Sequence, residues 1–206
     1  MKGALILAGG RSSRFGSDKA LAVLQGRPLI AHVVRTASQV ADEVVVAIGR
    51  ESNSSTYRKF LPASIRIVKD RWQVKSPLVG ILTGFKWMRS NYSVVLSCDT
   101  PFANRSVLGL LFKKATHFDA AIPRWPNGDI EPLQAVYRTR PAIPAAKMAL
   151  THKEFRNVDM IKRLRRITYV PVREIKQIDK DLVSFFNVNN RRDLRRAEAI
   201  QAFSRG

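Results

Sequence analysis

Residues 7–21 read LAGGRSSRFGSDKAL and follow directly on the apolar run MKGALI of residues 1–6. A short strand therefore leads straight into a glycine-rich loop that carries Arg11, Arg14 and then Lys19. Glycines let backbone N–H groups approach phosphate oxygens closely, and fixed cations neutralise the phosphate charge. The segment thus has the local chemistry needed to hold a triphosphate at the end of a strand.

The loop differs from two common phosphate-binding motifs. The P-loop requires G-x-x-x-x-G-K-[ST], whereas here Lys19 is followed by Ala20, which offers no hydroxyl group to a metal ion. The dinucleotide fingerprint G-x-G-x-x-G is absent as well.

The segment resembles the signature LAGG-x-S-x-R-[MF]-G-x-D-K of nucleotidyltransferases of the molybdenum cofactor guanylyltransferase family. The matching positions are Gly9, Gly10, Ser12, Arg14, Gly16, Asp18 and Lys19. The resemblance implies catalytic roles for Lys19, Arg14 and Asp99. It further implies nucleotide binding by Leu7, Ala8, Gly9, Gly10, Arg11, Lys19, Asp70 and Asp99. The alternative interpretation is a glycine-rich turn with a solvated basic face.

Length and composition favour one globular domain over residues 1–206, with 45% apolar residues. We expect no membrane span, because no stretch of 18 uncharged apolar residues occurs. The start of the chain lacks the pattern of a signal peptide. The single cysteine, Cys98, excludes an internal disulfide and fits a reducing cytoplasm.

The net charge of +20 makes nucleic acid the first partner to consider. The charge is spread over both halves of the chain, however, and no zinc-finger spacing, RNA motif or convincing recognition helix is visible. We therefore expect no nucleic-acid partner. The field could instead concentrate small polyanions such as nucleotides and phosphorylated pterins, or simply suit the host's internal salt.

Strand-like apolar runs alternate with helix-like segments along the chain. The expected strands are 3–8, 43–48, 64–68, 92–98, 119–123, 132–138 and 167–172. The expected helices begin near Pro28, cover 77–88, follow an N-cap at Asn104, fill roughly 141–166 as two segments, and end with 191–203. This alternation predicts a three-layer α/β/α fold with a Rossmann-like, mostly parallel sheet, which the resemblance specifies as nucleotide-diphospho-sugar transferase-like.

Ligands bind at the carboxyl ends of strands in such sheets. Three segments with charged or reactive side chains follow the carboxyl ends of expected strands. They are the LAGG loop, Asp70 after the third strand, and Cys98-Asp99 after the fourth. A carboxylate facing a triphosphate is a natural Mg²⁺ ligand, and Mg²⁺ needs one or two carboxylates plus phosphate oxygens. We therefore expect Asp99 to hold Mg²⁺, although it could instead cap the turn before Pro101. The family resemblance implies the same metal role.

The resemblance also implies that Lys19 contacts the nucleotide phosphates. There it would stabilise the charge that builds on the leaving pyrophosphate. Ser76–Ile81 resembles the family's G-P-L-x-G-[LIM], with Ser76 in place of the usual glycine. Gly80 would pack against either the purine or the sheet.

Three further residues are candidates for substrate contact. Glu131 lies in a segment resembling E-P-L-x-A-[VL]-[YF], and it would either orient the pterin substrate or bond a neighbouring loop. Asn187 and Asn189 lie in a segment resembling F-x-N-[IV]-N, and their alternation predicts that both face one side of a strand. Their alternative role is to cap the last helix. That helix lacks the family's T-P-E-D-L start, which should weaken it.

The implied reaction is transfer of GMP from GTP to molybdopterin, with release of pyrophosphate. The implied partners are GTP, molybdopterin, and other cofactor-biosynthesis proteins or acceptor apo-enzymes. The alternatives are a cytidylyltransferase acting on molybdopterin or methylerythritol phosphate, and a phospholactate guanylyltransferase. Gly9-Gly10 with Asp18-Lys19 favour guanine, since the resembling cytidylyltransferases carry L-A-A-G and a proline before the lysine. A basic nucleic-acid-binding protein on the same fold is the alternative outside this class.

Overall fold

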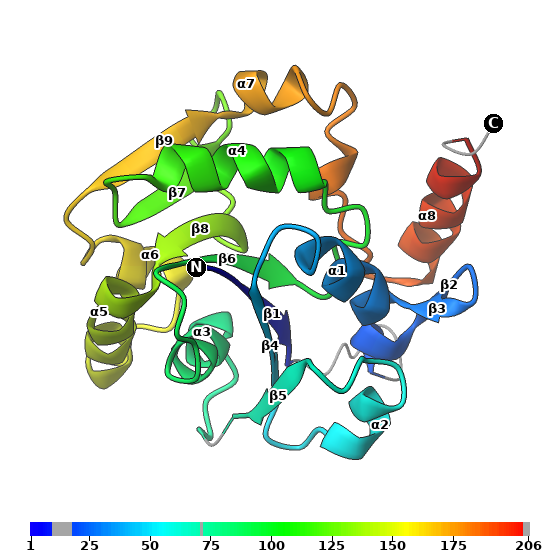
Figure 1. Cartoon of the computed structure of the whole chain (residues 1–206), viewed down its shortest axis with the longest axis horizontal. Helices are drawn as coiled ribbons and strands as arrows, with labels where there is room; N and C mark the ends of the chain where they lie inside the picture. The colour runs from blue at the N-terminus through cyan, green and yellow to red at the C-terminus, as the bar shows by residue number, and fades with distance from the viewer. Residues whose placement is uncertain (10–17, 71, 204–206) are drawn as a thin grey trace.

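The computed structural model describes residues 1–9, 18–70 and 72–203. Its centre is a seven-stranded sheet in the order β5-β4-β1-β6-β8-β7-β9 (Figure 1). These strands are β1 (Lys2–Ala8), β4 (Glu43–Ile48), β5 (Arg66–Lys69), β6 (Tyr92–Ser97), β7 (Ala120–Arg124), β8 (Gln134–Arg138) and β9 (Ile167–Pro171).

The sheet is mostly parallel, as the alternation of elements predicts. β1 pairs in parallel with β4 and β6, β4 pairs in parallel with β5, and β7 pairs in parallel with β9. Strand β8 is antiparallel to both of its neighbours, β6 and β7. The link from β7 to β8 contains no helix, and a connection of this kind favours antiparallel neighbours, because a parallel crossover usually needs one.

Helices cover both faces of the sheet and produce the predicted three layers (Figure 1). Helices α1 (Leu29–Ala37) and α4 (Arg105–Ala115) supply one buried apolar cluster. Helices α3 (Pro77–Phe85), α5 (Thr139–Thr151) and α6 (Asn157–Ile161) supply the cluster on the opposite face. No helix among the described residues is long and apolar enough to cross a membrane.

The sequence pattern does not predict several short elements of the structure. They are the hairpin of β2 (Val23–Leu24) and β3 (Arg27–Pro28), helices α2 (Ser54–Arg58) and α7 (Val172–Lys176), and the 3₁₀ helices η1 (Lys19–Leu21) and η2 (Val183–Phe185). The predicted strand around Asn187 and Asn189 is wrong, because residues 186–189 have no regular secondary structure. They are instead tied down locally, since the Val188 amide donates to the carbonyl oxygen of Asp99 at 2.9 Å.

The last helix, α8 (Arg191–Phe203), packs beside the β2–β3 hairpin through Leu24 and Ala197 (Figure 1). Its start is not weakly capped, contrary to expectation. The Asp193 amide donates to Asn190 Oδ1 at 3.0 Å, and Asp193 Oδ2 accepts from the Asn189 amide at 2.9 Å. This reciprocal pair satisfies the helix N–H donor of Asp193 and the amide of Asn189 just before the helix, much as a capping box does. The helix therefore holds Asn189 in place from its own first turn.

Gly84 in α3 tests how tightly this helix packs on β1, and Gly109 in α4 serves as the comparison. A Cβ added at Gly84 would lie 2.1 Å from Leu5 Cδ1, whereas one added at Gly109 in α4 meets nothing within 4 Å. Overpacking costs about 1–3 kcal/mol, and replacing a helix glycine by alanine gains about 1 kcal/mol. We expect Gly84→Ala to lower the melting temperature by a few degrees and Gly109→Ala to raise it by about 2–4 °C. Thermal unfolding that shifts in the same direction for both variants would contradict this packing.

Candidate active site

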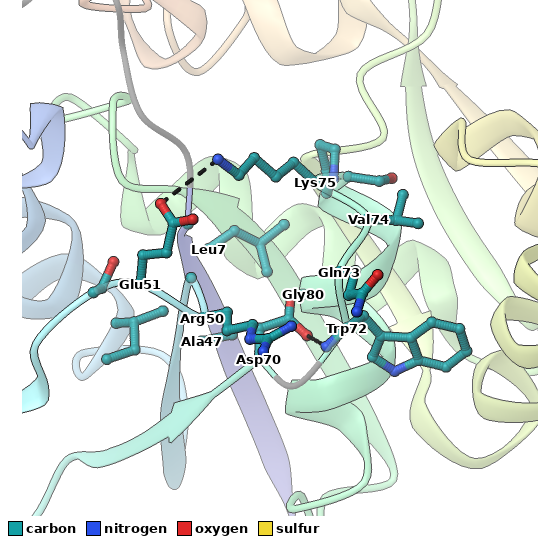
Figure 2. A pocket seen from close by; sticks show the side chains of 16 residues that line it. Leu7, Ala47, Arg50, Glu51, Asp70, Trp72, Gln73, Val74, Lys75 and Gly80 are labelled. Carbon is teal, nitrogen blue, oxygen red and sulfur yellow. Dashed lines mark hydrogen bonds and ion pairs between the residues drawn. The ribbon is translucent and has the colours of Figure 1, made fainter.

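A large pocket opens over the carboxyl ends of β1, β4 and β5, with a volume of about 570 Å³ (Figure 2). Four of the residues predicted from the sequence to bind nucleotide or pack beside it line this pocket: Leu7, Gly9, Asp70 and Gly80. In Figure 2 the side chain of Leu7 points into the space between Glu51 and Val74. An exposed ion pair joins Lys75 and Glu51 at 3.6 Å across the same space. The pocket has the size of a nucleotide site.

Asp70 and Gly80 also serve the structure around this pocket. Asp70 Oδ1 accepts from the Thr83 hydroxyl and from the Trp72 amide, both at 3.3 Å. A Cβ at Gly80 would lie 3.1 Å from Leu7 Cδ2, so this glycine makes room for Leu7. Ser76, which replaces the family's glycine, caps α3 by accepting from the Leu78 amide at 3.1 Å. The substitution thus preserves the helix entry.

The residues around Asp18 fix the backbone that carries Lys19. Asp18 caps η1 by accepting from the Ala20 amide at 3.1 Å. The buried Tyr57 hydroxyl lies 2.5 Å from Asp18 Oδ2 and 3.1 Å from the Ala8 carbonyl oxygen. Burial, and next the hydrogen bond to Asp18, raise the pKa of Tyr57 well above its ordinary value. The phenol therefore stays a hydrogen-bond donor and joins α2 to the end of β1.

Lys19, Asp99 and Asn189 form one cluster, although they are far apart in the sequence. The Lys19 ammonium pairs with Asp99 Oδ2 and donates to Asn189 Oδ1 at 3.1 Å. The Lys19 and Asp99 side chains are only 18% and 10% exposed. Charges this well shielded from water need a partner, because desolvating an unpaired ion is costly. The cluster therefore ties η1 to the end of β6.

Asp99 keeps one carboxylate oxygen for another ligand. Its Oδ1 is buried and has no hydrogen-bond partner among the described residues. No group of three or more His, Cys, Asp or Glu side chains in that part of the chain could hold a metal ion. Mg²⁺ requires no such group when phosphate oxygens complete its shell. The orphaned oxygen therefore fits the single protein contact expected of a magnesium–nucleotide site.

The neighbouring Cys98 is not suited to act as a nucleophile. Its thiol is buried, and burial, followed by the charge of Asp99, raises its pKa well above the ordinary value. A thiol held in its protonated form is a poor nucleophile.

A second pocket, of about 260 Å³, lies over β6 and β8 and has Asp99 in its lining. Glu131 and Asn187 line it, as do Gln134 and Asn157. Glu131 Oε1 accepts from the Trp125 indole N–H at 2.7 Å, so this carboxylate does bond a neighbouring loop. Asn187 donates to the Phe185 carbonyl oxygen at 3.0 Å. Asp99 thus lines this smaller pocket, and β6, which it follows, pairs with β1 beside the large one.

Four further residues predicted to bind nucleotide or act in catalysis do not form part of the described site. Gly10, Arg11 and Arg14 are outside the described residues. Ala8 is buried in the core rather than exposed to the large pocket. The sequence analysis did not identify Tyr57, Gln134 or Asn157 as part of the site. A signal was available for Gln134, because it is a polar residue inside the otherwise apolar run PLQAVY.

Comparisons with known proteins identify the family of the chain. The sequence model of the MobA-like NTP transferase domain matches residues 4–167. The chain therefore belongs to the MobA-like NTP transferase family, a group of nucleotidyltransferases. It is 33% identical over 198 residues to the probable molybdenum cofactor guanylyltransferase of Methanosarcina mazei, covering 94% of this chain and 88% of that protein. It is 31% identical to the molybdenum cofactor guanylyltransferase of Desulfosudis oleivorans, covering 95% and 93%.

Solved structures place the fold in the same group. The molybdopterin-guanine dinucleotide biosynthesis protein A of Archaeoglobus fulgidus matches with a TM-score of 0.83 and 29% identity, covering 98% of this chain and all of that one. The 2-C-methyl-D-erythritol 4-phosphate cytidylyltransferase of Thermus thermophilus matches with a TM-score of 0.70 at 14% identity, covering 98% and 100%. The second likeness concerns the fold alone.

We expect Lys19→Ala to retain the fold and to lower the rate constant of nucleotidyl transfer about 10²–10³-fold, as removal of one charge-stabilising donor typically does. Lys147→Ala is the matched control, because it removes an exposed lysine of α5 that lines neither pocket. Single-turnover rates at saturating substrate measure both. A Lys19→Ala rate within a few-fold of Lys147→Ala would exclude the catalytic role.

Proposed function

We propose that this chain is a molybdenum cofactor guanylyltransferase, which transfers GMP from GTP to molybdopterin and releases pyrophosphate. The observation that carries the proposal is the Lys19–Asp99–Asn189 cluster, whose Asp99 lines the smaller pocket and keeps a carboxylate oxygen unpaired among the described residues. The names of the relatives from Methanosarcina mazei and Desulfosudis oleivorans support this choice of donor and acceptor. The reaction takes place in the cytoplasm, where the lone Cys98 stays reduced.

The proposal gives each substrate its own pocket. GTP occupies the 570 Å³ pocket, with its phosphates directed toward the end of β1, and molybdopterin occupies the 260 Å³ pocket. The acceptor's phosphate and the α-phosphate of GTP then meet beside Asp99, which lies at the edge of the smaller pocket. Holding two reactants in this geometry supplies much of the catalytic effect.

The chain's own task is to position the two anions and neutralise them. A phosphate oxygen of molybdopterin attacks the α-phosphorus of GTP, and the bond to the β-phosphate oxygen breaks as pyrophosphate leaves. The nucleophile is already an anion, so no general base is needed. An ammonium has three donors; two of those on Lys19 reach Asp99 and Asn189, and the third can donate to a phosphate oxygen.

A magnesium ion belongs to this proposal. Asp99 Oδ1 would hold it, and the bound ion would offset negative charge on the phosphates. Arg11 and Arg14 add positive charge to the same loop in the family pattern. Gly9 and Asp70, which line the large pocket, contact the nucleotide.

We expect Asp99→Asn to impair the use of magnesium more than the binding of GTP. Asparagine keeps the shape of aspartate and loses the charge that attracts Mg²⁺. A magnesium titration of transfer activity should therefore shift to much higher concentrations, while the Kd for GTP changes little. Asp181→Asn, which removes an exposed carboxylate, is the control. Superimposable titrations for wild type and Asp99→Asn would show that Asp99 is only a turn residue.

Base choice tests the guanine assignment. A pocket that pairs with the N1–H and N2 donors of guanine leaves its acceptors unpaired when cytosine binds, and each unpaired group costs about 1–3 kcal/mol. Two such groups give roughly 30-fold or more discrimination between GTP and CTP. Calorimetric titrations with Mg²⁺ at raised salt measure it, because the general attraction to triphosphates is the same for every base. Equal affinity for both nucleotides would refute the guanylyltransferase assignment and leave a general nucleotidyltransferase.

A further inference from the structure

The smaller pocket contains a buried amide that nothing in the described structure satisfies. Gln134 is the first residue of β8 and is only 2% exposed, yet neither its Nε2 nor its Oε1 has a hydrogen-bond partner among the described residues. Buried polar side chains nearly always have partners, and an unpaired one calls for an explanation such as a missing ligand. Because Gln134 lines the 260 Å³ pocket, the missing partner is expected to be the molecule that binds there.

Asn157 in α6 also has a buried side-chain atom without a hydrogen-bond partner in the described part of the chain. It is the first residue of α6, it lines the same pocket, and its Oδ1 is buried without a partner. The turn before it is well ordered, because the Arg156 amide donates to Asp159 Oδ2 at 3.0 Å. Two side-chain amides with buried atoms that no described residue satisfies thus line one pocket, Gln134 from β8 and Asn157 from α6.

The pattern of donors and acceptors defines a class of ligand. The Gln134 amide offers an acceptor beside a donor, which matches the N–H and C=O of a cyclic amide in a bidentate pair. An acceptor at Asn157 Oδ1 then suits an amino group next to that ring N–H. A 2-amino-4-oxopyrimidine presents this order of groups along one edge, and the pterin of molybdopterin carries such a ring.

The rest of the pocket suits a flat ring. Leu133, Pro132 and Phe185 supply apolar lining, and the Phe185 ring is braced by Trp125 at a centroid distance of 5.6 Å. A cavity of 260 Å³ has room for a fused ring system rather than for a nucleoside triphosphate. Asp99 lines the same pocket and pairs with Lys19, so the cluster is within reach of a phosphate carried on a side arm of the ring.

We propose that Gln134 and Asn157 determine acceptor specificity by reading the 2-amino-4-oxo edge of the pterin ring. This inference rests on the proposed function, since it concerns the acceptor of that reaction. Guanine carries the same edge, so the size of the pocket must separate the two ligands.

The test compares Gln134→Leu with Ser184→Ala. Ser184 is also buried with an unpaired hydroxyl, but it does not line the pocket. Removing an unsatisfied buried group relieves its desolvation cost, so both variants should melt about 2–4 °C higher than wild type. Only Gln134→Leu should raise the KM for molybdopterin, by about 10-fold or more for two lost hydrogen bonds. Its Kd for GTP should stay within about twofold of wild type, since the nucleotide occupies the other pocket.

Fluorescence titration with free pterin gives a readout that needs no turnover. Wild type should bind pterin more tightly than lumazine, which has a second oxo group in place of the amino group. Asn157→Asp, whose oxygens can only accept, should keep that preference, and Gln134→Leu should lose most affinity for both rings. Gln134→Met serves the same purpose if the leucine variant folds poorly.

Two failures remain distinguishable. If wild type transfers GMP to molybdopterin but Gln134→Leu and Gln134→Met keep its KM and its pterin affinity, the specificity role is wrong and the proposed function stands. If wild type transfers no GMP to molybdopterin, the proposed function fails and this inference fails with it.

Discussion

The ion pair between Lys19 and Asp99 is the interaction on which the arrangement of the site depends. It joins η1 to the end of β6, and Asn189 attaches the segment before α8 to the same ammonium. Each charge compensates for the desolvation of the other, because an isolated buried ion is desolvated at high cost. Asp99 also lines the smaller pocket, so the same contact fixes the local structure and the place where the two substrates are proposed to meet.

The surroundings of this pair show how a rigid frame is built for it. Tyr57 and Asp18 hold the start of η1, the Val188 amide binds the Asp99 carbonyl oxygen, and the reciprocal cap of α8 restrains Asn189. The first two contacts join segments that are distant in the sequence, and the third fixes the backbone of Asn189. Preorganised donors of this kind are effective in catalysis because they need no rearrangement during the reaction.

Much of the fold could be predicted from the sequence because strong local patterns agreed with it. The valine run of Glu43–Ile48 forms a strand with the expected bounds, and Asn104 caps α4 as expected. The reversed direction of β8 and the irregular course of residues 186–189 depend on contacts between distant segments, which no local pattern encodes. The motifs located Lys19, Asp99 and Asn189 but could not show that they touch. Gln134 and Asn157 were missed because an unsatisfied amide is recognisable only when its surroundings are known.

A double-mutant cycle on Lys19 and Asp99 tests the account most directly. The measurement is the single-turnover transfer of α-labelled GMP from GTP to molybdopterin by wild type, Lys19→Ala, Asp99→Asn and the double variant. Residues that act as one unit give strongly non-additive losses, so the double variant should be about as slow as the slower single variant. Losses that simply multiply would show that the two residues act independently and would contradict a catalytic centre built on their ion pair.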